Sequence, residues 1–408
     1  MIVLGNGTTS HTLVTLRTLG KPGITGLTNA CIATDDNSVI FDTARGPQTL
    51  MSGETVTIDG QGQVIYNGAV PITPDSRNDD YFTVMNWAER HKRMDVLATA
   101  DTLKDIQLAN INGAEGIGLC RVEKFFQQDD CLELVRRFVL AETFTERSQY
   151  LVQLIPLHQA HFEEIFGLTG NCQMSVRLLD PSLHEFLPSP ESPTYEEDLK
   201  TLADQLYMPF DQCNRRIRAI QEENPLMGFR GAKLGIVFPE ITEMQVKAII
   251  GAAVSLKRRN FVSLPQIILP NASTQGEVER LTSIVSTVSD NVCAKAWTDS
   301  SFNQKTITSK ITCMLQTPRA CLKAADFAKT ALVCDAMFDT EVLTTMMFGM
   351  DRADSYAFMV RLFFVIHYFT LTVDYGFDAC YSHNKLLIYY LLRITFAEHL
   401  PAAPHCGS

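Results

Sequence analysis

The spacing of hydrophobic and polar positions divides the chain into regions of different periodicity. In residues 56–66, apolar residues alternate with polar ones on both sides of an Asp-Gly pair, which predicts a β-hairpin. Together with a helical apolar run near the start, this hairpin predicts a small α/β domain over residues 1–68. The polar, proline-bearing segment that follows predicts a linker over residues 69–82.

Between residues 83 and 358, short apolar runs alternate with amphipathic stretches. Strand and helix in repetition predict a parallel sheet, and seven candidate strands predict a (β/α)8-like, TIM-type barrel that is incomplete at its last strand. Polar residues such as Asp101 stand where the runs end, which is where such barrels carry their chemistry. An acidic, helical stretch over residues 190–223 interrupts the pattern after the third run. The seven candidate strands are residues 94–102, 114–123, 175–181, 229–236, 264–270, 312–318 and 331–338.

Residues 359–408 lack this rhythm and form a divergent, aromatic-rich tail. Arg361, His367 and Arg393 interrupt its apolar runs, whereas a membrane-spanning helix needs about 20 apolar residues. We therefore expect buried or irregular helices in the tail, and no membrane partner.

Composition narrows the class of protein further. The formal net charge of -11 argues against nucleic acid as a partner, because phosphate binding requires a basic surface. A hydrophobic content of 46% is sufficient for packed cores in two domains. The 11 cysteines include no CxxC pair, which favours reduced thiols over disulfides or a zinc site. No signal peptide is recognisable, so the default expectation is a cytoplasmic protein.

A histidine near the start follows directly on helix-capping residues. Thr8, Thr9 and Ser10 are N-cap residue types, and the apolar positions after them predict a helix with His11 in its first turn. Unpaired backbone N–H groups and the positive end of the helix dipole would stabilise a phosphate there. The pattern also fits an ordinary surface histidine at a helix start, so the local sequence leaves both interpretations open.

Four blocks of the sequence resemble the motifs of one enzyme family. The blocks stand in the family's order and at its separations, and they resemble pyruvate, phosphate dikinase, one of the phosphoenolpyruvate-utilising enzymes. Bacterial enzyme I of the sugar phosphotransferase system shares the architecture but lacks the third block. The resemblance extends from about residue 5 to about residue 355. The four blocks are TTSHTLVTLRTLGKPG (8–23), GAEGIGLCRVEKFF (113–126), SVRLLDPSLHEFLP (175–188) and EENPLMGFRGAKLGIVFPEITEMQ (222–245).

The resemblance implies a swivelling phosphohistidine domain, followed by a barrel that holds phosphoenolpyruvate or pyruvate at its rim. His11 corresponds to the phosphorylated histidine of the family. Arg121, Arg177 and Arg230 correspond to its substrate-binding arginines. Planar guanidinium groups suit a dense anion, because they bind phosphoryl and carboxylate groups at two points.

Two acidic residues within the same motifs are expected to hold the arginines in place. They are Asp180 and Glu123, for which a helix or strand cap is the alternative role. A surface or interface salt bridge is the alternative role for each arginine. The resemblance also implies Mg²⁺ as a cofactor and a homodimer formed through the barrel.

The chain departs from the family pattern at the metal-binding carboxylates. Gln316 and Val342 stand where the family has Glu and Asp, which argues against bound Mg²⁺ because a neutral side chain is a poor ligand for a hard dication. The family's CGEHGG strand, with its proton-donating cysteine, has no counterpart, since Cys380 and His383 lack its flanks. The family has an ATP-grasp domain before the TTSH block, which this sequence does not show; if the chain is a phosphotransferase, we expect a separate ATP-binding chain as a partner.

These features leave two main hypotheses for function. The first is an impaired pyruvate, phosphate dikinase-like phosphotransferase fragment that moves a phosphoryl group between His11 and pyruvate or phosphoenolpyruvate. The second is a non-catalytic, anion-binding or regulatory relative, a pseudoenzyme that associates with a full-length dikinase. A decayed or misread gene is a third possibility. Retained arginines with missing metal carboxylates favour the second hypothesis.

Overall fold

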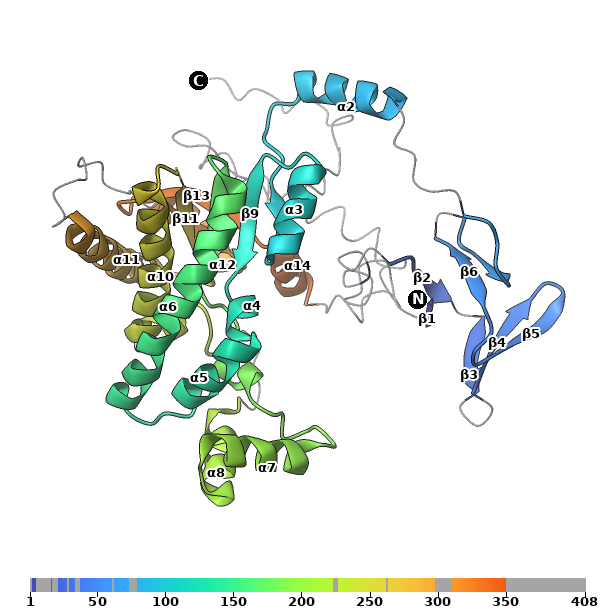
Figure 1. The fold of residues 1–408 in the computed structure, drawn as a ribbon, viewed down its shortest axis with the longest axis horizontal. Helices are drawn as coiled ribbons and strands as arrows, with labels where there is room; N and C mark the ends of the chain where they lie inside the picture. Colours follow the sequence, from blue (N-terminus) through green and yellow to red (C-terminus); the bar gives the residue numbers. More distant parts are fainter. Residues whose placement is uncertain are drawn as a thin grey trace, which may run out of the picture.

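The computed structural model contains a group of N-terminal strands and a larger body built on a parallel sheet (Figure 1). The structure describes residues 2–4, 16, 21–27, 29–33, 37–60, 62–72, 79–222, 227–261, 263–297 and 310–349. His11 with most of its predicted helix, and the tail from residue 359, lie outside the described residues.

The N-terminal strands form three small sheets. β1 and β2 pair in parallel, β3, β4 and β5 form an antiparallel sheet in that order, and β6 pairs with β7 as an antiparallel hairpin. The hairpin joins Val56 to Asn67 and Asp59 to Val64, so the hairpin predicted for residues 56–66 is confirmed. The strands are β1 (Ile2–Leu4), β2 (Ile24–Leu27), β3 (Ala30–Ala33), β4 (Ser38–Thr43), β5 (Gly46–Met51), β6 (Val56–Asp59) and β7 (Val64–Asn67).

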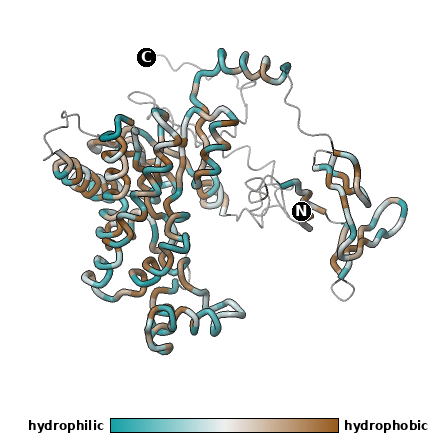
Figure 2. The backbone as a smooth tube through the Cα atoms, viewed as in Figure 1, coloured by the Kyte–Doolittle hydropathy of each residue, from teal (hydrophilic) through white to brown (hydrophobic). Residues whose placement is uncertain are grey.

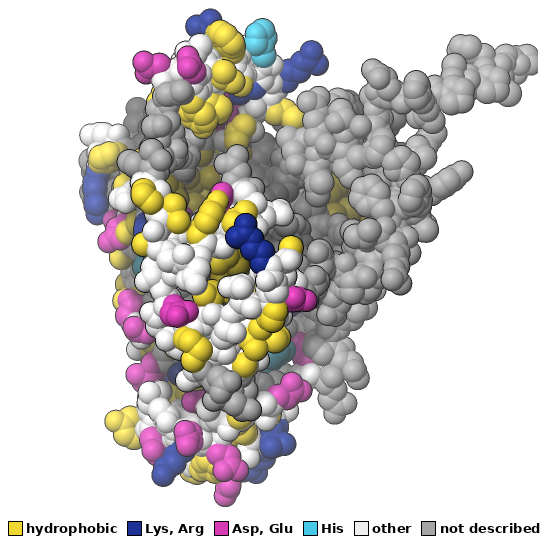
Figure 3. Space-filling view, turned by 90° about the vertical axis from the view of Figure 1, so that its right-hand side faces the viewer, with side chains coloured by type: hydrophobic (Ala, Val, Ile, Leu, Met, Phe, Trp, Pro, Cys, Tyr) yellow, Lys and Arg dark blue, Asp and Glu magenta, His cyan; other side chains and the backbone are white. Residues whose placement is uncertain are grey.

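Helix α2 (Asp79–His91) connects the two groups of elements and begins inside the segment predicted as a linker. None of its residues is buried, and its exposed apolar side chains include Phe82 and Trp87. Hydrophobic and basic side chains accordingly gather at the top of the molecule in Figure 3, where α2 lies in Figure 1.

Six parallel strands form the sheet of the body among the described residues. Their order in the sheet is β13-β12-β11-β10-β9-β8, so each strand lies beside its predecessor in the chain. Parallel strands in sequential order, separated by helices, are the arrangement of a TIM-type barrel, and the predicted fold class is confirmed. The strands are β8 (Ala98–Thr99), β9 (Gly116–Arg121), β10 (Gln173–Arg177), β11 (Leu264–Leu269), β12 (Lys310–Leu315) and β13 (Val333–Phe338).

Helices follow most of these strands, and several begin at side-chain caps. Thr102 with Asp105, and Thr143 with Glu146, form complete capping boxes at the starts of α3 and α6. The helices of the body are α3 (Leu103–Ile111), α4 (Glu123–Phe126), α5 (Asp129–Val139), α6 (Phe144–Thr169), the 3-10 helix η1 (Leu183–Phe186), α7 (Tyr195–Leu206), α8 (Phe210–Ile220), α9 (Ala232–Val237), α10 (Pro239–Arg258), α11 (Gln275–Trp297), α12 (Pro318–Leu322), α13 (Ala324–Phe327) and α14 (Thr340–Phe348). None of the described helices is long and apolar enough to span a membrane.

The prediction of a fourth strand at residues 229–236 is wrong, because helix α9 begins at Ala232 within this range. β10 and β11 pair directly, from Gln173 with Leu264 to Arg177 with Ile268, so no strand lies between them. The left-handed backbone of Gly231 (φ 56°) turns the chain into α9, whose buried side chains join the core.

The two faces of the parallel sheet have different partners. Val176, Ile267 and Cys313 lie in the main core together with the buried faces of α6, α10 and α11. In Figure 2, hydrophobic stretches of the backbone run through the middle of the body. On the inner face, a smaller cluster forms around Ile268, Met314 and Met337, against which Leu97 and Leu119 pack. This alternation follows from the two-residue repeat of a strand.

The inner face also has a polar layer near the amino ends of its strands. The side-chain amide of Gln173 donates to Gln266 Oε1 at 2.6 Å, Ser175 Oγ donates to the same oxygen at 3.1 Å, and Gln266 Nε2 donates to Asp335 Oδ2 at 2.5 Å. Layers of inward-pointing side chains are a feature of barrel interiors.

A buried histidine on α6 makes the stability of the body depend on pH. His158 packs edge-on against Phe126 at 4.7 Å between ring centroids, and neither ring nitrogen has a hydrogen-bond partner. Burial, with a smaller contribution from His161, lowers the pKa of His158 to about 4. The folded state therefore prefers the neutral ring, and stability present above pH 6.5 is lost as the pH falls towards 4.

We predict that replacing His158 by Phe reduces the acid sensitivity of folding. Between pH 7 and pH 4.5, wild type should lose about 2 kcal/mol more unfolding free energy than His158→Phe. Urea unfolding at the two pH values measures the difference, with His91→Gln at the exposed end of α2 as the control. Equal losses in wild type and His158→Phe would contradict the assignment.

Candidate functional site

Charged and amide side chains gather at the carboxyl ends of the parallel strands. Arg121 and Arg177 end β9 and β10 and are register partners in the sheet. Asp101, Gln316 and Asp339 stand shortly after β8, β12 and β13. Because the strands are parallel, these residues share one rim, which is where barrel enzymes place their active sites.

Arg177 is held between two acidic residues. Its Nη2 pairs with Glu123 Oε1, and its Nη1 lies 3.2 Å from Asp180 Oδ2. Only 10% of the arginine side chain is exposed, whereas the Asp180 side chain is completely buried. The two acidic residues therefore hold Arg177 in place.

Arg230 reaches the same carboxylate from the loop before α9. Its Nη2 donates to Asp180 Oδ2 at 2.6 Å, and its Nε donates to the backbone oxygen of Asp180 at 3.2 Å. Gly231 allows this approach, because a Cβ there would lie 3.1 Å from Asp180 Oδ1 and 2.7 Å from Asn271 Cβ. Burial alone would lower the pKa of Arg230, but the charge and hydrogen bonds of Asp180 outweigh burial and raise it.

Arg121 has a carboxylate partner of its own. Its backbone N–H donates to Asp101 Oδ1 at 2.8 Å, and its Nε donates to Oδ2 at 2.9 Å. Burial opposes the charged guanidinium, yet Asp101 raises the pKa of Arg121 above its ordinary value. Arg121 is the most open of the three arginines, with 40% of its side chain exposed against 28% for Arg230.

Glu123 has an environment that opposes its negative charge. Burial raises the pKa of this carboxyl, and the charge of Arg177 only partly counteracts the effect. Its Oε2 atom is buried without a hydrogen-bond partner, as are Arg177 Nε and Gln316 Oε1. Unsatisfied polar atoms collected at one rim are typical of a binding site.

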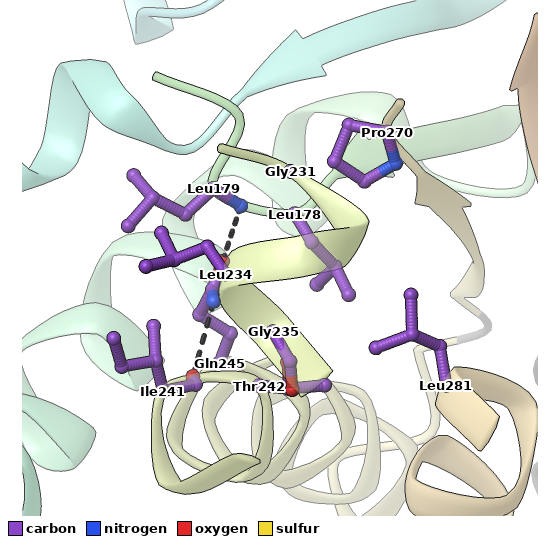
Figure 4. A pocket seen from close by; sticks show the side chains of 10 residues that line it. All are labelled: Leu178, Leu179, Gly231, Leu234, Gly235, Ile241, Thr242, Gln245, Pro270 and Leu281. Atoms are coloured by element: carbon purple, nitrogen blue, oxygen red, sulfur yellow. Dashed lines mark hydrogen bonds between the residues drawn. The ribbon is translucent and has the colours of Figure 1, made fainter. Parts of the chain in front are cut away.

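The loop that carries Asp180 rests firmly on helix α10. The backbone N–H of Leu179 donates to Gln245 Oε1 at 2.7 Å, and Gln245 Nε2 donates to Ile241 O at 3.0 Å (Figure 4). The cavity between this loop, α9 and α10 measures only about 10 Å³, so the loop has almost no free volume beneath it. The packing of this loop against α9 and α10 therefore fixes the position of Asp180.

Asp339 is a site residue that the sequence reasoning missed. Its Oδ1 accepts the backbone N–H of Val342 at 3.2 Å and caps α14, while its Oδ2 accepts Gln316 Nε2 at 3.1 Å. Gln316 Nε2 also lies 3.2 Å from Asp180 Oδ2. The position of Asp339 directly after a predicted strand was the signal available in the sequence.

These residues do not fit the divalent cation that the family resemblance implies. Among the described residues, no group of three or more His, Cys, Asp or Glu side chains is placed to hold a metal ion. Gln316 presents an N–H donor to the two nearest carboxylates, and Val342 lies in the first turn of α14 with no ligating atom in its side chain. Mg²⁺ prefers oxygen ligands, usually carboxylates and water.

Comparison with known proteins identifies the class to which this fold and rim belong. Residues 76–375 match the family described as PEP-utilising enzyme, PEP-binding domain, and the chain belongs to this family. It resembles the chloroplastic pyruvate, phosphate dikinases of Mesembryanthemum crystallinum (35% identical) and Flaveria pringlei (36% identical), each over 85% of this chain. Pyruvate, phosphate dikinase 2 of Zea mays is 35% identical over the same share.

The resemblance predicted from the four motifs is thus confirmed. The matched region covers 35% of the length of the Mesembryanthemum and Flaveria proteins and 38% of the Zea mays protein. The chain therefore spans roughly a third of the length of these relatives.

We predict that Gln245 is needed to support the Asp180 loop. Gln245→Leu keeps the side-chain volume but leaves the buried N–H of Leu179 without an acceptor, which should cost about 1–3 kcal/mol of unfolding free energy. The control Lys247→Ala, on the same helix at a half-exposed ion pair, should change stability by only about 0.5 kcal/mol. Denaturant unfolding measures both, and equal effects would contradict the role of Gln245.

Proposed function

We propose that the rim formed by Arg121, Arg177 and Arg230 binds phosphoenolpyruvate or pyruvate. The observation that supports this proposal is that Arg121 and Arg177 stand at adjoining strand ends, while Arg230, from the loop before α9, shares the buried Asp180 with Arg177. Phosphoenolpyruvate carries a phosphoryl and a carboxylate group, and both accept two-point hydrogen bonds from a planar guanidinium.

A ligand at this rim has to compete with acidic side chains for the arginines. Each arginine has a carboxylate partner, so an incoming anion has to compete with Asp101, Glu123 or Asp180. Arg121 and Arg230 are the more exposed arginines and offer the first contacts, whereas Arg177 lies deeper. A ligand with several negative charges competes better than a singly charged one, because it accepts charge-assisted hydrogen bonds from more than one arginine.

We further propose that phosphoryl transfer between His11 and this ligand is strongly reduced. Transfer requires stabilisation of the charge that develops on the enolate oxygen of pyruvate, to which arginines contribute together with a cation. Gln316 and Val342 supply no negative ligand at the two positions that the family motif assigns to the cation. Binding of the anion needs only the arginines and is retained under this proposal.

We predict that substituting an exposed arginine of the rim weakens phosphoenolpyruvate binding. Arg121→Gln and Arg230→Gln each remove charge-assisted hydrogen bonds, and each should raise the dissociation constant about 10- to 100-fold. Isothermal titration calorimetry measures this change, with Arg259→Gln, whose side chain is 62% exposed after α10, as a surface control. Wild-type protein that fails to bind, or variants that bind as tightly as wild type, would refute the proposed site.

We predict that phosphoenolpyruvate binds without appreciable transfer of its phosphoryl group to His11. Incubation with labelled phosphoenolpyruvate and Mg²⁺, followed by detection of acid-labile phosphate, should give labelling no higher in wild type than in His11→Ala. Rapid labelling that His11→Ala abolishes would instead establish an active phosphotransferase.

A further inference from the structure

The amide of Gln316 joins two carboxylates at the rim. Its Nε2 atom lies within hydrogen-bonding distance of Asp180 Oδ2 (3.2 Å) and Asp339 Oδ2 (3.1 Å). The three residues come from different parts of the sheet: the loop after β10, the end of β12 and the end of β13. Gln316 and Asp180 are buried, so water contributes little to the neutralisation of the Asp180 carboxylate.

The two carboxylates determine the orientation of the amide. An amide has two N–H donors on nitrogen and only lone pairs on oxygen. If Oε1 faced Asp180 and Asp339, three acceptor oxygens would meet without a proton between them. The donor orientation is therefore the stable one while no cation is bound, even though it leaves Gln316 Oε1 buried without a partner.

Both carboxylates also have further partners that hold them in position. Asp180 is paired with Arg177 and Arg230, and Asp339 caps helix α14 through the N–H of Val342. The charge of Asp339 also contributes to the raised pKa of Arg230, which places it within the same electrostatic cluster. Asp339 is thus part of the rim as well as a helix cap.

We propose that the Gln316 amide takes the place of a divalent cation between Asp180 and Asp339, so that the rim binds its anion without metal. The identity of the anion rests on the function proposed above, but the part played by Gln316 can be tested without any anion. Two N–H groups satisfy the facing carboxylate oxygens, and a cation could enter only by displacing a buried side chain.

A single isosteric change should convert this arrangement into a cation site. Gln316→Glu replaces the N–H donor by a third carboxylate beside Asp180 and Asp339, and such a group of oxygen ligands attracts Mg²⁺ or Mn²⁺. Without a cation, repulsion among three neighbouring carboxylates should lower the thermal stability of the variant.

The test measures Mn²⁺ binding through the electron paramagnetic resonance signal of the free ion. Gln316→Glu should bind Mn²⁺ about tenfold or more tightly than wild type, while Gln205→Glu, on the exposed face of α7, should behave as wild type. The double variant Gln316→Glu/Asp339→Asn should lose this increase in Mn²⁺ affinity. The proposal would be overturned if wild type bound Mn²⁺ and Asp339→Asn abolished that binding. This comparison remains possible even if the Gln316 variants do not fold.

A second measurement separates this inference from the proposed function. Calorimetric titration of wild type with phosphoenolpyruvate should give the same affinity in EDTA and in excess Mg²⁺. Binding that requires Mg²⁺ would overturn the part assigned to Gln316 while leaving phosphoenolpyruvate binding intact. Absence of binding in both buffers would overturn the proposed function, and the Mn²⁺ titration would still decide the role of Gln316.

Discussion

The carboxylate of Asp180 is the charge on which the rest of the rim depends. It is completely buried, and a buried charge costs several kcal/mol unless it is paired and hydrogen-bonded. Arg177, Arg230 and Gln316 supply those partners, and each comes from a different element. The loop after β10, the turn before α9 and the end of β12 are therefore held together through one carboxylate.

Pairing with carboxylates also explains why the arginines stay charged and ordered before any ligand binds. Burial opposes a guanidinium charge at Arg121 and Arg230, and the neighbouring carboxylates offset that cost. The sheet contributes the remaining geometry, since the register of β9 and β10 sets Arg121 beside Arg177. A rim built in this way holds its guanidinium groups in defined positions before any ligand is present.

Much of the fold could be predicted from the sequence, because hydrophobic periodicity and capping residues are local signals. Six of the seven candidate strands are strands in the structure. The exception, residues 229–236, is a short apolar run whose local pattern cannot distinguish a strand from a buried helix; the contact of Gly231 with Asp180 decides between them. Asp339 was missed for a related reason, since its role depends on Gln316, 23 residues away.

An amide and a divalent cation can both stabilise two neighbouring carboxylates, but they differ in the charge that they contribute. A neutral amide satisfies the lone pairs of Asp180 and Asp339 but adds no positive charge to the rim. The arginines still attract an anion in its ground state, because their charges do not depend on Gln316. Under the proposed function, the charge that develops during phosphoryl transfer would lack the additional stabilisation that a dication gives. On that proposal, the substitution at one strand end separates binding from catalysis.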